Sequence, residues 1–327
     1  MRAASYSRFG PAAEVIEIGE IDTPEPGPGE VRVKLAYSGV NPSDAKARSG
    51  IRPGVTKPPY PRVIPHSDGA GEIEAVGEGV EAARIGQPVW IWNGAWQRPF
   101  GTAAEYICLP AEQAVALPDG TDLRTGATLG IPGLTAAQTV FGGGDVSGQT
   151  LLISGGAGAV GHNAVQLARW GGARVIATCG SSGTERVRAA GADAVFDYSD
   201  PELAAKITEA APEGIDRAVE VEFGVNAALL GEVMKPLGTV AAYGSGKDMT
   251  PTLPFGAFLF KALKVDITLI YLLPAVQREK IISCLHAALT AGALAPEIDE
   301  VMPLARCAEA HEALMTPGRA GAVLLEI

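Results

Sequence analysis

The sequence has few cysteines, and they do not form a metal-binding or disulfide pattern. Cys108, Cys179, Cys284 and Cys307 lie far apart among the 327 residues, and no C-x-x-C pair occurs. Disulfide frameworks and zinc knuckles both need cysteines at close, regular spacing. We therefore expect four ordinary, mostly buried thiols.

A long uninterrupted apolar run is also missing. The N-terminal stretch MRAASYSRFG has no apolar core, and the most apolar later stretch, FGAFLFKALKVDITLIYLL, is interrupted by Lys261, Lys264 and Asp266. A membrane-spanning helix needs about 20 predominantly apolar residues in a row, and a signal peptide needs an apolar core. The sequence predicts a cytoplasmic protein without a membrane partner.

Positive charge is scarce as well. The chain has 26 Lys and Arg against 37 Asp and Glu, which gives a net charge of -11 and a pI near 4.9. Such a charge repels phosphate backbones and anionic lipid. Nucleic acid is therefore not an expected partner, and any anionic ligand must be held by local donors.

Glycine and apolar residues, by contrast, are abundant. The 41 glycines and 47% hydrophobic content suit a globular α/β enzyme. The length predicts two domains. In the central third, short apolar runs alternate with helical patterns, which predicts a doubly wound parallel sheet of Rossmann type. The predicted strands are Thr150–Ser154, Ala173–Cys179, AVFDY, DRAVEVE and GTVAAYG.

A glycine-rich turn follows the first of these strands. GGAGAVG contains G-x-G-x-x-G, and a helical pattern runs from it to Gly171 and Gly172. In this context the motif predicts a dinucleotide site, with the pyrophosphate at the start of the helix. The alternative is a glycine-rich turn that binds nothing. The predicted phosphate-binding residues are Gly156, Ala157, Gly158, Ala159, Val160 and Gly161.

The end of the next strand indicates the cofactor type. An acidic residue there would favour NAD, but the chain reads CGSSGTERVR. Ser181 and Ser182 offer hydroxyl groups, and Arg186 is placed to pair with a 2'-phosphate, so we expect NADPH. The alternative for Arg186 is a solvated helix residue beside Glu185 and Arg188.

Taken together, four segments resemble the medium-chain dehydrogenase/reductase superfamily, and within it the zinc-independent, zeta-crystallin-like quinone oxidoreductases. They are SGVNPSDAKARSG, PHSDGAGEIEAVGEGV, LGIPGLTAAQTVF and GGAGAVGHNAVQLAR. The resemblance implies a partly open, GroES-like β-barrel domain formed by residues 1–125 and 267–327, with the nucleotide-binding domain inserted at 126–266. We also expect a homodimer, because KVDITLIYLL would be an apolar edge strand that needs a partner.

The resemblance also implies a site without zinc. Asn41 stands where the zinc-dependent relatives have a cysteine, and Ser67 stands where they have a histidine, with His66 one residue out of register. A catalytic zinc needs about three protein ligands and a structural zinc needs four. Only one cysteine, Cys108, lies near the lobe that would carry a structural zinc. We expect no zinc of either kind, and His66 as a hydrogen-bonded loop residue.

Without a Lewis acid, the substrate must accept hydride unaided, which suits a quinone or an enone. We expect SGVNPSDAKARSG to form a polar loop after the strand-like run Val31–Tyr37. Asn41 in this loop is the first candidate donor to the acceptor oxygen, while Asp44 and Lys46 order the loop, relay a proton or form a solvated ion pair. The resemblance places Thr135 near the nicotinamide, with a helix cap as the alternative. It also adds Tyr198 beside the adenosine phosphate, and Tyr243, Gly244 and Ser245 beside the nicotinamide.

Three functions compete at this point. The first is NADPH-dependent quinone reduction, and the second is NADPH-dependent reduction of an enone or enoyl double bond with the same hydride geometry. The third is an NADPH-binding structural or RNA-binding protein without turnover, against which the acidic charge argues.

Overall fold

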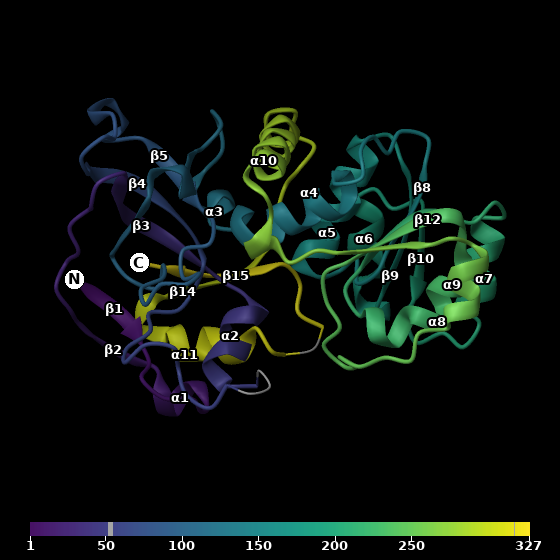
Figure 1. Cartoon of the computed structure of the whole chain (residues 1–327), viewed down its shortest axis with the longest axis horizontal. Coiled ribbons are helices and arrows are strands. Elements are labelled where there is room, and N and C mark those ends of the chain that lie inside the picture. Colours follow the sequence, from purple (N-terminus) through teal and green to yellow (C-terminus); the bar gives the residue numbers. More distant parts are fainter. Residues whose placement is uncertain (52–54, 317) are drawn as a thin grey trace. The chain divides into compact units, whose positions relative to one another are not determined.

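Six parallel strands form the sheet of the central part of the chain. The computed structural model describes residues 1–51, 55–316 and 318–327, which form two compact units, Met1–Ile131 with Ile298–Ile327, and Pro132–Glu297. In the second unit the strand order is β10-β9-β8-β11-β12-β13 (Figure 1). The strands are β8 (Thr150–Ile153), β9 (Arg174–Cys179), β10 (Ala194–Asp197), β11 (Ile215–Glu220), β12 (Met234–Ala242) and β13 (Lys264–Ile267).

Helices connect these strands, as the alternation of patterns predicted. The strand β8 is buried along Leu151, Leu152 and Ile153, because a central parallel strand is covered on both faces. The helices are α4 (Leu134–Phe141), α5 (Ala159–Trp170), α6 (Thr184–Ala189), α7 (Leu203–Ala210), α8 (Phe223–Val233), α9 (Phe255–Phe260) and α10 (Ala275–Thr290), with short 3-10 turns η4 (Ser181–Gly183) and η5 (Ile270–Leu272). The doubly wound fold predicted from the sequence is confirmed.

The first unit contains a seven-stranded, mostly antiparallel sheet. Its order is β14-β15-β3-β4-β5-β7, and β6 pairs with β3. A small hairpin-like pair, β1 (Arg2–Ser5) with β2 (Glu17–Glu20), lies apart from it. The sheet strands are β3 (Glu30–Val40), β4 (Asp68–Val76), β5 (Pro88–Ile91), β6 (Tyr106–Pro110), β7 (Ala114–Ala116), β14 (Ile298–Pro303) and β15 (Ala322–Glu326).

Short helices cover parts of this first unit. The last of them, α11, contacts both α1 and α2, and the three lie together in Figure 1. An apolar cluster that includes Val40, Ile64, Cys307 and Leu325 forms the core beneath α11. The helices are α1 (Ala12–Val15), α2 (Pro42–Ser49), α3 (Leu123–Gly126) and α11 (Cys307–Ala313), the 3-10 turns are η1 (Ala82–Arg84), η2 (Ala111–Gln113) and η6 (Leu304–Arg306), and η3 (Leu129–Gly133) is one π-helical turn.

The chain returns to the first unit at Ile298, later than the residue 267 that we expected. The reason is that KVDI, as β13, pairs with β12 in the parallel sheet, and the following α10 packs against α4 in the same unit. Only four residues of KVDITLIYLL form a strand, because the chain turns into η5 at Ile270. This strand does lie at the edge of the sheet.

In the described part of the chain, no helix combines the length and the apolar character needed to cross a membrane.

Candidate functional site

The glycine turn after β8 is closely packed at two positions of its motif. A Cβ on Gly161 would lie 2.1 Å from the carbonyl oxygen of Gly155, and a Cβ on Gly156 would lie 3.1 Å from Val187. By contrast, a Cβ on Gly158 would approach nothing closer than 3.5 Å. Gly156 and Gly161 therefore serve the packing of the turn, and Gly158, the second glycine of the motif, leaves open a side from which a ligand can approach.

The helix α5 begins directly at this turn. Its N-cap residue is Gly158, and among the described residues no side chain caps this end. The first backbone N–H groups of such a helix carry partial positive charge and need acceptors from elsewhere. The turn and this helix end therefore fit the pyrophosphate of a dinucleotide, even in an acidic protein.

A buried carboxylate lies at the same edge of the sheet, and the sequence analysis missed it. Glu220, at the end of β11, is 1% exposed and accepts hydrogen bonds from Asn226 Nδ2 at 2.9 Å and Ser154 Oγ at 3.2 Å. Burial raises the pKa of Glu220, while the bonds from Glu222 N, Asn226 and Ser154 oppose that rise. The only sequence signal was an acidic residue ending a buried strand. Glu220 fixes the ends of β8 and β11 where the cofactor would lie.

The turn after β12 sits next to this carboxylate. Tyr243 N donates to the Glu220 carbonyl at 2.9 Å, and burial, with a further contribution from Glu220, raises the pKa of the Tyr243 phenol. A Cβ on Gly244 would lie 2.4 Å from the Val221 carbonyl oxygen, and Ser245 Oγ accepts from Gly224 N at 2.8 Å. The predicted residues Tyr243, Gly244 and Ser245 therefore line the carboxyl edge of the sheet.

Thr135 lies inside α4, one residue after its start. It is buried, and its carbonyl accepts a hydrogen bond from Thr139 Oγ1 at 2.8 Å. The N-cap of α4 is Gly133, so the alternative that Thr135 is a cap does not hold. Its proposed place near the nicotinamide stays a prediction.

The predicted adenosine end of the site brings together residues from three connections. Ser181 and Ser182 form η4 after β9 and are exposed, and the Tyr198 ring lies 3.6 Å from the position of a Cβ on Gly180. Lys247 Nζ lies 6.0 Å from the centre of the Tyr198 ring, a cation–π arrangement that sequence reasoning did not find. Lys247 therefore places positive charge beside Tyr198.

Arg186 has a different partner from the predicted one. Its Nε lies 2.9 Å from Glu297 Oε2, and His162 Nε2 lies 3.5 Å from the other oxygen of the same carboxylate. The alternative of a fully solvated helix residue is wrong, because the Arg186 side chain is only 20% exposed. A 2'-phosphate at Arg186 would have to compete with Glu297.

The segment SGVNPSDAKARSG is a strand end and a helix rather than a polar loop. Asn41 is the N-cap of α2, Pro42 is its first residue, and Asp44 Oδ2 accepts from Asn41 N at 2.8 Å. This is a capping box, favoured by proline at the first helical position. Asp44 is buried and holds the start of α2, so the alternative of a solvated ion pair with Lys46 is wrong and the alternative that Asp44 orders this segment is confirmed.

The side chain of Asn41 is buried against another acid. Asn41 Nδ2 donates to Asp68 Oδ2 at 2.7 Å, and burial raises the pKa of Asp68 well above its usual value. Ser67 is buried beside it. An amide and a hydroxyl thus stand at the two positions where the zinc-dependent relatives have metal ligands, and neither is among the usual zinc ligands.

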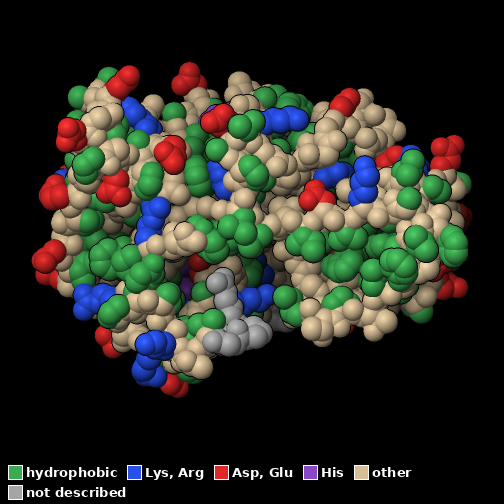
Figure 2. Space-filling view, viewed as in Figure 1, with side chains coloured by type: hydrophobic (Ala, Val, Ile, Leu, Met, Phe, Trp, Pro, Cys, Tyr) green, Lys and Arg blue, Asp and Glu red, His purple; other side chains and the backbone are tan. Residues whose placement is uncertain are grey.

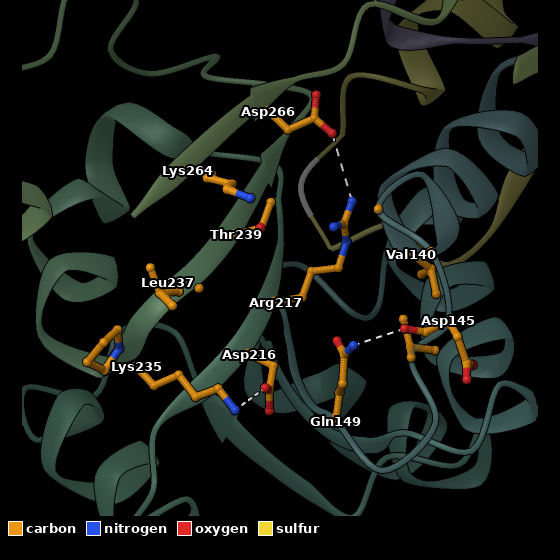
Figure 3. A pocket seen from close by; sticks show the side chains of 15 residues that line it. Val140, Asp145, Gln149, Asp216, Arg217, Lys235, Leu237, Thr239, Lys264 and Asp266 are labelled. Carbon is orange, nitrogen blue, oxygen red and sulfur yellow. Dashed lines mark hydrogen bonds and ion pairs between the residues drawn. The ribbon is translucent and has the colours of Figure 1, made fainter. Parts of the chain in front are cut away.

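A separate cavity of about 530 Å³ lies at the amino ends of the parallel strands, opposite the glycine turn (Figure 3). Gln149, Asp216, Lys235 and Lys264 line it, and each lies within one residue of the start of a strand. Ligands of open α/β sheets bind outside the carboxyl ends of the strands. This cavity is therefore distinct from the dinucleotide site.

A glycine turn at the carboxyl edge of a doubly wound sheet, joined in one chain to a mostly antiparallel sheet, defines a two-domain dinucleotide-binding protein. Matches to two known families support this class. Residues 27–119 match the alcohol dehydrogenase GroES-like domain, and residues 159–285 match the zinc-binding dehydrogenase family.

Individual relatives match over the whole chain. The quinone oxidoreductase of Rattus norvegicus is 30% identical over 99% of this chain and 97% of its own length. Among solved structures, an NAD-dependent alcohol dehydrogenase (28% identity) and a mycobacterial protein complexed with NADPH (25% identity) both match with a TM-score of 0.87 and cover 100% of both chains. The chain belongs to the quinone oxidoreductase family of the medium-chain dehydrogenase/reductase superfamily.

Proposed function

We propose that this protein is an NADPH-dependent quinone oxidoreductase that works without a metal. The observation that carries the proposal is the turn closed by Gly161, which leaves the start of α5 free to hold a pyrophosphate. The full-length similarity to a quinone oxidoreductase supports the acceptor class. The dinucleotide supplies the hydride, and the residues described above bind it and hold its ring.

Two residues stand where the zinc-dependent relatives have metal ligands, and they limit the kind of substrate. Asn41 and Ser67 offer hydrogen bonds in place of a Lewis acid, so an alkoxide would be poorly stabilised. A quinone spreads the incoming negative charge over its conjugated system and needs only a positioned donor. Asn41 is the proposed donor, and Thr135, Tyr243, Gly244 and Ser245 are the proposed contacts of the nicotinamide. Asp44 holds the start of α2 and thereby the backbone of Asn41.

The function is tested with a panel of quinones, enones and simple alcohols in the presence of a metal chelator. We expect loss of reduced-nicotinamide absorbance with quinones, an unchanged rate in chelator, and no stoichiometric zinc by elemental analysis. Turnover confined to enones would favour the double-bond reductase instead. One tightly bound zinc per chain, or loss of activity in chelator, would contradict the metal-free mechanism.

For the cofactor, we propose that NADPH is preferred and that Lys247 joins Ser181 and Ser182 in holding the 2'-phosphate. Among the described residues Lys247 has no carboxylate ion pair, whereas Arg186 is paired with Glu297. Lys247→Ala should therefore weaken NADPH binding by about tenfold, and Arg186→Ala by only about threefold, with NADH affinity nearly unchanged in both. Equal losses for NADPH and NADH would show that these residues act on the fold instead. Isothermal titration with both cofactors measures this.

We also propose a cytoplasmic homodimer that pairs at β13. This edge strand has Val265 and Ile267 exposed at 38% and 78%, and Phe260 in the neighbouring segment is 89% exposed. Hydrophobic side chains gather over the region where α8 and α9 lie (Figure 2). An exposed apolar edge of this kind is an aggregation hazard unless a partner covers it.

A further inference from the structure

Three side chains that can bind metal meet in the core of the first unit. His66, Cys307 and His311 each offer one ligand atom, and these atoms lie within 4.8 Å of one another. All three residues are completely buried. They coincide with neither zinc position of the family, because His66 precedes Ser67 and the other two come from the C-terminal segment.

Local geometry brings the three together. Cys307 and His311 are four residues apart on α11, so they lie on one face of the helix. His66 precedes β4 and adopts a left-handed φ of 78°, a costly conformation for a residue other than glycine. Its ring stacks on that of His311, with Nε2 to Nε2 at 2.9 Å.

A chain of hydrogen bonds fixes the protons of the two imidazoles. Thr102 Oγ1 donates to the Asp68 carbonyl at 2.5 Å, so its oxygen must accept from Ser38 Oγ at 2.8 Å. Ser38 has then no further hydrogen, and it accepts from His66 Nδ1 at 2.8 Å. Both rings are completely buried, which favours the neutral imidazole that metal binding requires.

His311, the last residue in this series of hydrogen bonds, is left with a free lone pair. Since His66 Nδ1 carries the hydrogen, His66 Nε2 accepts from His311 Nε2, and His311 Nδ1 is bare. This nitrogen is fully buried and has no hydrogen-bond partner among the described residues. Buried polar atoms without partners are rare in proteins. The bare Nδ1 can take up a hydrogen, so the His311 ring can change tautomer and present its Nε2 lone pair to an ion.

We propose that His66, Cys307 and His311 bind one Cu(I) ion. Thiolate and imidazole ligands suit both Cu(I) and zinc. However, a closed zinc site needs four ligands, and in the described part of the chain no fourth His, Cys or carboxylate joins the group. Three ligands suffice for Cu(I).

Charge favours the same ion. One Cu(I), one thiolate and two neutral imidazoles sum to zero, whereas Zn²⁺ would leave one net positive charge in an apolar core. Asp44 and Arg48 both act on Cys307 with opposite sign, so the surroundings supply no counter-charge. A neutral complex is therefore the one that this core accommodates.

Binding of Cu(I) releases one proton to solvent. The Cys307 thiol, whose pKa is raised to about 12 by burial, gives its proton to solvent as the Cu–S bond forms. The hydrogen shared by the two Nε2 atoms moves to the free Nδ1 of His311, which leaves both Nε2 lone pairs for the metal. No electron is transferred, because the ion enters as Cu(I).

The test loads the full-length protein by anaerobic refolding from guanidinium with one equivalent of Cu(I), followed by desalting against the Cu(I) chelator bicinchoninate. Refolding makes the buried site accessible, and circular dichroism confirms recovery of the fold. We expect about one copper per chain and a rise in Tm of about 5 °C. X-ray absorption should show one sulfur and two nitrogen neighbours.

Matched variants identify the ligands. Cys307→Ser and His311→Gln should each retain below about a fifth of the wild-type copper, whereas Cys108→Ser, which removes a thiol elsewhere in the same unit, should retain all of it. If either ligand variant does not refold, the sulfur and nitrogen count of the wild type decides alone. The proposal is overturned if the refolded wild type retains no copper or binds only Zn²⁺. It is also overturned if Cys307→Ser retains as much copper as the wild type does.

Discussion

Gly161→Ala is expected to raise the dissociation constant for NADPH by roughly a hundredfold, because the turn that holds the pyrophosphate must open. A Cβ at this position would lie 2.1 Å from the carbonyl oxygen of Gly155 and 2.9 Å from the Cα of Gly156. Neither is the end of a flexible side chain, so backbone must shift. Such overpacking also costs about 1–3 kcal/mol of unfolding free energy. Cofactor titration and thermal unfolding measure both effects.

Gly256→Ala is the matched control for this substitution. Gly256 lies in α9, and nothing lies within 4 Å of where its Cβ would be. Alanine in a helix is more favourable than glycine by about 0.5–1 kcal/mol, so this variant should be slightly stabilised and should bind NADPH normally. If Gly161→Ala bound NADPH as tightly as Gly256→Ala does, the turn would not be the phosphate site.

Asn41→Ala is expected to lower turnover with good quinone acceptors by roughly tenfold to a hundredfold. Loss of one preorganised donor elsewhere has cost about 100- to 1,000-fold, but hydride transfer to a quinone builds less localised charge. The Asn41 amide also bonds Asp68 at 2.7 Å, so we expect an additional stability loss of about 1–3 kcal/mol. Turnover is therefore measured well below the melting temperature of the variant.

Asp68→Asn separates the two roles of Asn41. It alters the partner of the amide, and leaves Asn41 itself in place. Should Asp68→Asn lose as much turnover as Asn41→Ala, the effect would come from packing around α2. Should Asn41→Ala keep wild-type turnover on every good acceptor, Asn41 would be only the cap of that helix.

The parallel sheet was predictable because its signals are local and repeated. Each strand of the second unit is a short apolar run, and each link has helical spacing, as in β8 and α5. The prediction of a loop around Asn41 was wrong, although the sequence there carries a local signal for a helix. Asn41, Pro42 and Asp44 form a helix-start signature, and this local signature, more than the polarity of the segment, decides its conformation.

The late return of the chain at Ile298 could not be read in the same way. Helix α10 carries no feature that assigns it to one unit, and its membership depends on packing against α4. Pairing across long stretches of sequence is governed by topology, and no periodicity within a segment encodes it.

By itself, the sequence determined the dinucleotide turn, because the restriction on Gly161 comes from Gly155 and Gly156, a few residues away in the chain. Only the tertiary structure decided which charged and polar groups face one another. Glu297 reaches Arg186 across 111 positions, and His66 meets His311 across 245. Such contacts depend on how strands and helices stack, so a residue's neighbours along the chain carry no information about them.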